Sequence, residues 1–161
     1  MAPYLVILIA LAVLWLSVGS TVSGQEPRPP ESESELEVQF ESEEAADGSG
    51  SSPITCGAQS HITPYFGTFY NWGGVTSCNQ TMTYLEVESW LDFWDEADAR
   101  YHNIGHIGPK PCPSTNFCAR SRLDSLSTAL WKARTRHYMV APPGYSPPTN
   151  TGWTWATRNV P

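Results

Sequence analysis

The sequence predicts an α+β fold: a small secreted domain, stabilised by disulfides, with two helices and short strands after a disordered acidic N-terminal arm. Three observations support this prediction. Apolar residues recur at helical spacing within residues 83–101, four cysteines follow an apolar N-terminal segment, and more than half of the acidic residues precede residue 53. We therefore expect three parts: a signal peptide over 1–24, an acidic linker over 25–52 and a globular domain over 53–161.

The apolar run from Tyr4 to Val18, followed by small and polar residues, is typical of a secretory signal peptide. Its length of about 15 residues is short for a membrane span, which needs about 20. We expect cleavage before Gln25. No second apolar run follows, so the sequence predicts a secreted, extracellular protein with no membrane span after cleavage.

Residues 25–52 carry nine acidic side chains against the single base Arg28 and contain few large apolar groups. Mutual repulsion and the lack of apolar surface favour disorder. Ser49, before Gly50 and after several acids, is a possible site for glycosaminoglycan attachment. The favoured alternative is an unmodified flexible linker, because such short motifs arise by chance in acidic, serine-rich segments.

The four cysteines of the domain predict two disulfides, because an even number in a secreted chain is normally oxidised. If each cysteine pairs with its nearest neighbour in the sequence, the disulfides are Cys56–Cys78 and Cys112–Cys118. We favour this pairing, although the other two connectivities stay open. Residues 61–74, aromatic and interrupted by glycine and proline, predict short strands joined by turns. Asn79 begins the only N-glycosylation sequon of the chain.

Residues 83–101 predict an amphipathic helix, with Thr83 and Glu86 as a capping box. Its apolar face would consist of Val87, Trp90, Leu91, Trp94, Ala97 and Tyr101. We expect Trp90 and Trp94 to be buried in the core. Residues 102–118 then predict a loop closed by the last two cysteines, and residues 121–136 a second helix. Residues 137–141 predict a short strand, and the turn-rich C-terminal part places Trp153 and Trp155 in an edge strand or an exposed pair.

No pattern in the sequence predicts a catalytic or metal site. His102 and His106 stand four residues apart, but glycine and proline interrupt a helix there and oxidised cysteines cannot act as thiolate ligands. Serine-nucleophile and phosphate-loop motifs are absent from the sequence. We therefore expect no enzyme activity, no cofactor and no metal. A small hydrolase with His102, His106 or His137 as the base is kept as an alternative.

Acidic and basic residues occupy different parts of the domain sequence. Residues 86–98 contain six acidic and no basic residues, and residues 100–136 contain seven basic residues and one acidic residue. Either these groups pair with each other, or they form a surface that recognises a charged partner. The bases are too few and too scattered for DNA or RNA.

These features favour an extracellular binding protein that engages another protein or a cell-surface receptor. The candidate binding residues are Trp153, Trp155, Lys132, Arg134 and Arg136. The alternative class is the precursor of a cationic membrane-active peptide, released from its acidic pro-segment, with an amphipathic region around Leu130, Trp131 and Lys132.

Overall fold

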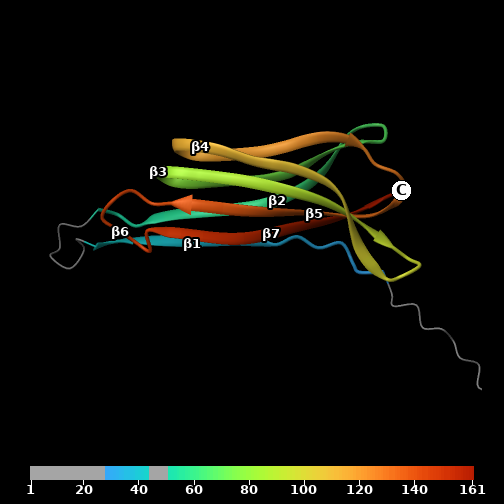
Figure 1. Cartoon of the computed structure of the whole chain (residues 1–161), viewed down its shortest axis with the longest axis horizontal. Helices are drawn as coiled ribbons and strands as arrows, with labels where there is room; N and C mark the ends of the chain where they lie inside the picture. Colours follow the sequence, from blue (N-terminus) through green and yellow to red (C-terminus); the bar gives the residue numbers. More distant parts are fainter. Residues whose placement is uncertain (1–27, 44–50) are drawn as a thin grey trace, which may run out of the picture.

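The computed structural model describes residues 28–43 and 51–161, and these residues form strands with no α-helix (Figure 1). The strands are β1 (Glu35–Ser42), β2 (Ile54–Phe66), β3 (Phe69–Asp95), β4 (Arg100–Ser125), β5 (Ala129–Val140), β6 (Tyr145–Ser146) and β7 (Thr149–Val160). They form a nearly closed, barrel-like sheet. The predicted α+β class with two helices is therefore wrong.

The long strand β3 organises this sheet because it pairs with three other strands, all antiparallel. Its first part, residues 69–78, pairs with β2, and its later part, residues 84–93, pairs with β5. Strand β4 pairs with β3 from one end of the hairpin to the other. Figure 1 shows the two strands running side by side along the long axis, with the turn that joins them at the lower right.

The two ends of the sheet meet at β1 and β7. Strand β7 pairs with β5, and β1 pairs with β2. Just before β1, the Ser34 amide donates to the Trp155 carbonyl at 2.8 Å, and the Thr157 amide donates to the Ser32 carbonyl at 2.7 Å. These bonds bring the chain before β1 against β7 and nearly close the barrel.

The interior contains two apolar clusters. One surrounds Phe40, Leu85 and Met139, and the other surrounds Trp72 and Trp131. Successive side chains of a strand point to opposite faces, so alternate residues of β3 and β5 reach this interior. Burial of both clusters is the main favourable contribution to folding.

A buried polar layer lies between the two clusters along the strands. It consists of Ser60, Thr76, Ser89, Thr135, His137 and Thr154, which come from β2, β3, β5 and β7. His137 is fully buried and its ring nitrogens bond to the hydroxyls of Thr76 and Thr154, both at 2.8 Å. Because every member has a hydrogen-bond partner, the layer avoids the cost of unpaired buried polar groups.

Both predicted disulfides are confirmed, in the pairing that nearest neighbours favoured. Cys56 and Cys78 are directly opposite each other on β2 and β3 and are buried in the core. Cys112 and Cys118 both belong to β4, with Cα atoms 5.9 Å apart. Six extended residues would span about 20 Å, so the chain bends between them.

The helix predicted over residues 83–101 is wrong, because most of this segment belongs to β3. Leu85, Val87, Ser89 and Leu91 are buried at a spacing of two and point into the barrel. Val87 and Leu91 also fit a helical i, i+3, i+4 pattern with Trp90 and Trp94, and pairing with β4 and β5 decided between the two periods. Trp94 is buried as expected, 8% exposed, whereas Trp90 is only half-buried and lies on the outer face.

The second predicted helix, residues 121–136, is also wrong. Its residues divide between the end of β4 and β5, with a short connection over residues 126–128. The predicted loop over residues 102–118 is likewise strand, because it pairs with β3. The strand expected at residues 137–141 is confirmed over 137–140 as the end of β5. Strands expected within residues 61–74 are confirmed in the β2–β3 hairpin.

Part of the segment that was predicted to be disordered is folded. Glu35–Ser42 forms β1, with Val38 and Phe40 buried and Leu36 packed against the same core. Composition favoured disorder, but the apolar residues alternate with acids and give the strand one buried face. The predicted signal peptide, the cleavage site before Gln25 and Ser49 lie outside the described residues.

Nowhere in residues 28–43 and 51–161 does a helix have the length and apolar character needed to cross a membrane. The two disulfides are compatible with an extracellular location.

Candidate functional site

One outer face of the sheet, here called the Trp–Arg face, carries aromatic and charged side chains together. It consists of Glu86, Glu88, Trp90 and Asp92 of β3, Lys132, Arg134 and Arg136 of β5, and Trp153 and Trp155 of β7. The alternation of β5 explains the division: Ala133, Thr135 and His137 point into the barrel, so the bases between them point outward. Strand β5 thus presents a row of three cations.

The acids of β3 neutralise two of these cations. Arg134 donates to both oxygens of Asp92, from Nε at 2.5 Å and Nη2 at 3.2 Å. Arg136 Nη2 lies 3.0 Å from Glu86 Oε1 and 2.8 Å from Glu88 Oε2. Of the two readings of the charge separation, mutual pairing therefore accounts for these five groups. The pairs also hold both guanidinium groups in fixed positions.

The aromatic part of the face centres on Trp90. Its ring stacks on His106 of β4, with centroids 5.0 Å apart, and contacts Trp153 across β5 at 5.1 Å. His106 Nε2 in turn lies 2.8 Å from Glu88 Oε1. Trp153 and Trp155 remain 48% and 40% exposed. The face therefore displays large rigid aromatic surface beside fixed guanidinium groups.

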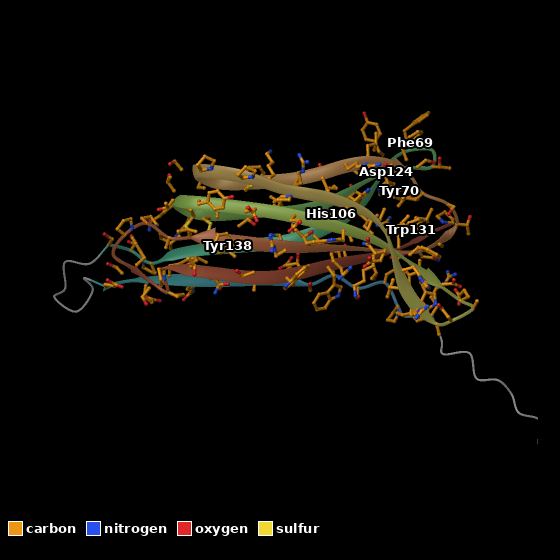
Figure 2. The ribbon with its side chains drawn as sticks, in the orientation of Figure 1. Phe69, Tyr70, His106, Asp124, Trp131 and Tyr138 are labelled. Atoms are coloured by element: carbon orange, nitrogen blue, oxygen red, sulfur yellow. A yellow bond between two sulfur atoms is a disulfide. The ribbon has the colours of Figure 1, made fainter. Side chains whose placement is uncertain are left out.

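Two hollows flank this aromatic centre. The first, of about 320 Å³ and here called the lysine hollow, is lined by Asp92, Tyr101, Asn103, Lys132 and Arg134. The second, of about 510 Å³, is lined by Tyr84, Glu86, Arg136, Tyr138 and Thr151. Figure 2 shows Tyr138, His106 and Trp131 in turn along the long axis of the molecule. The Trp–Arg face therefore has one hollow on each side of its tryptophan residues.

All five binding residues predicted from the sequence lie on this one face. Sequence reasoning missed Trp90, His106, Asp92 and Tyr101 as their neighbours. Alternation of Glu86, Glu88, Trp90 and Asp92 with buried residues was the signal that could have found the β3 members.

Asn79 lies apart from the Trp–Arg face, at the Cys56–Cys78 disulfide. It is exposed, its Oδ1 accepts from the Thr55 amide at 3.0 Å, and its Nδ2 donates to the Pro53 carbonyl at 3.2 Å. Its glycosylation stays a prediction.

The histidines considered as catalytic bases occupy three different environments. His137 is enclosed in the polar layer, and burial lowers its pKa to about 4. His106 contacts Glu88, and His102 Nε2 lies 2.9 Å from Asp98 Oδ2 at the β3–β4 turn. The structure therefore does not bring the three imidazoles together.

Among the residues that the structure describes, Asp95, Asp98 and His102 form the group whose geometry comes nearest to a metal site. Their ligand atoms all lie within 4.8 Å of one another. Arg100 Nε is 2.6 Å from Asp98 Oδ2. Desolvation raises the pKa of the Asp98 carboxyl, but the hydrogen bonds and charges of His102 and Arg100 together outweigh it and lower the pKa. An ion here would have to compete with that guanidinium group.

The amphipathic region predicted around residues 130–132 is part of β5. Leu130 and Trp131 are buried, and the indole of Trp131 donates to the Ser127 carbonyl at 2.8 Å. Trp131 belongs to the interior cluster, whereas Lys132 lies on the outer face.

The chain matches no model of a protein family, and no curated protein matches its sequence.

Proposed function

We propose that this protein is a secreted binding protein that engages an extracellular protein or receptor through its Trp–Arg face, in a role that is not catalytic. The observation that carries this proposal is the gathering of Trp90, Trp153 and Trp155 with two fixed arginines on one sheet face. Tryptophan, tyrosine and arginine are the residue types that most often dominate binding energy at protein interfaces.

The geometry favours binding because the groups of the face are already ordered. Asp92 holds Arg134, Glu86 and Glu88 hold Arg136, and the Trp90 ring is fixed between His106 and Trp153. The side chains of the Trp–Arg face would therefore lose little conformational freedom when a partner binds, and this small entropic cost supports affinity. Buried cores of interfaces also favour aromatic residues over lysine and glutamate.

The test is a direct binding screen of the purified secreted protein against extracellular proteins and receptor ectodomains. The variant Trp153→Ala should weaken binding to a partner found in this way by about 2 kcal/mol, which is roughly thirtyfold. It should also leave the thermal unfolding midpoint nearly unchanged, because this side chain is half exposed.

Phe117→Ala is the matched control. Phe117 is 55% exposed, but it lies on β4 opposite Ser77, away from the Trp–Arg face. This variant should bind as the unchanged protein does. Equal losses of affinity in both variants, or no saturable binding to any protein of the screen, would contradict the proposal.

A further inference from the structure

Lys132, in the lysine hollow, is the one cation of β5 that no carboxylate neutralises. Its Nζ lies 5.0 Å from the centre of the Tyr101 ring and 5.6 Å from that of Trp155. Within the described part of the chain it has neither an ion pair nor a hydrogen bond. Aromatic rings attract an ammonium group but do not remove its charge.

The nearest acid, Asp92, has its hydrogen-bonding capacity largely in use. It is buried, accepts two bonds from Arg134, and accepts a third from Asn103 Nδ2 at 2.8 Å. One carboxylate thus stands beside two cations, and the hollow carries one uncompensated positive charge. Burial lowers the pKa of the Lys132 ammonium group, Arg134 lowers it further, and Asp92 opposes the change.

The hollow also holds an excess of hydrogen-bond donors. Arg134 has five N–H groups and directs the edge formed by Nε and Nη2 at Asp92. The edge formed by its two terminal nitrogens has no second acceptor among the described residues. Lys132 adds three donors. The Tyr101 hydroxyl is buried and has no hydrogen-bond partner within residues 28–43 and 51–161. A complementary ligand is therefore anionic and rich in acceptors.

We propose that the lysine hollow binds a carboxylate of the partner protein, from an aspartate or glutamate side chain. This inference rests on the proposed function, since it names the chemistry that the partner brings to one end of the Trp–Arg face. A carboxylate would supply the missing charge to Lys132. Its planar pair of oxygens also matches the free edge of the Arg134 guanidinium group.

The first experiment needs neither a variant nor a known partner. The side-chain NMR signals of Lys132 in the full secreted protein are followed during titration with sodium acetate, at ionic strength held constant with chloride. We expect a saturable shift of these signals and a rise in the pKa of Lys132. Lys110, which donates to the Ala119 carbonyl on β4, is the internal control and should not respond. Equal, non-saturating responses at both lysines would overturn the inference.

Parallel titrations with sodium sulfate and sodium phosphate identify the type of anion. If acetate saturates the hollow at a lower concentration than sulfate or phosphate does, the result supports an acidic side chain of the partner as the ligand. Sulfate or phosphate that saturates at a much lower concentration would overturn the assignment to a carboxylate and point to a sulfated or phosphorylated ligand.

Two variants separate this inference from the proposed function. Lys132→Gln should weaken acetate binding and partner binding by about tenfold each, and Lys132→Arg should restore most of both because it keeps the charge. If Lys132→Gln binds a partner normally while Trp153→Ala does not, the carboxylate subsite is wrong and the binding face stands. If acetate saturates the hollow but the screen finds no partner, the proposed function fails while the anion site remains.

Discussion

His137 should make the stability of this protein fall as the pH is lowered. Its imidazole is fully buried, and burial lowers its pKa from 6.5 to about 4. The native state therefore holds the neutral ring, whose nitrogens bond to Thr76 and Thr154. The unfolded chain has the higher pKa and takes up a proton first, so protonation favours unfolding.

The size of this effect follows from the two pKa values. The contribution is fully present above about pH 6.5 and is lost progressively down to about pH 4, a total of about 3 kcal/mol. Between about pH 7.5 and about pH 5, the free energy of unfolding should fall by about 2 kcal/mol from this group alone. Most carboxylates titrate below that interval, so they contribute less to the change.

Urea unfolding at these two pH values, on the unchanged protein and on His137→Gln, measures the effect. The glutamine amide can bond to the threonines but does not titrate, so the variant should lose much less stability between the two conditions. His61→Gln is the comparison, because the pKa of His61 is also lowered by burial, but this side chain is only half-buried. Equal pH-dependent losses in His137→Gln and in the unchanged protein would refute the reasoning, as would an NMR titration of His137 with a midpoint near 6.5.

Three further predictions concern the barrel core. Replacing both Cys56 and Cys78 by alanine removes a bridge between residues 22 apart and should lower the free energy of unfolding by about 3 kcal/mol, measured by urea unfolding. Replacing both Cys112 and Cys118 by alanine should lower it by about 2 kcal/mol, because that disulfide closes a shorter loop. Gly74→Ala should destabilise by about 1 to 3 kcal/mol, because its methyl group would lie 2.4 Å from the Thr135 side chain; a midpoint equal to that of the unchanged protein would contradict this contact. Trp94→Ala should cost about 3 to 5 kcal/mol in urea unfolding, and near-native stability with lost partner binding would instead place Trp94 in the proposed interface.

Sequence patterns predicted five candidate binding residues that lie together on the Trp–Arg face, but the local structure predicted for them was wrong. Lys132, Arg134 and Arg136 alternate with Ala133 and Thr135, which is a strand pattern, yet their leucine-rich N-terminal flank favoured a helix. The burial of Thr135 and His137 concealed the alternation, because polar residues do not count as core positions in a sequence pattern. The hydrogen bonds that make their burial possible come from β2, β3 and β7, which are distant in sequence.

The sequence by itself determined the features that depend on neighbouring residues. These were the oxidation of all four cysteines, for which nearest neighbours in sequence favoured the observed pairing without excluding the other two, and the short strands of the β2–β3 hairpin. Only the tertiary structure decided between helix and strand over residues 83–136, because long-range pairing of β3 with β2, β4 and β5 outweighs local preference. It also placed Lys132 between two aromatic rings from β4 and β7 without a counter-charge, a contact that no local spacing encodes.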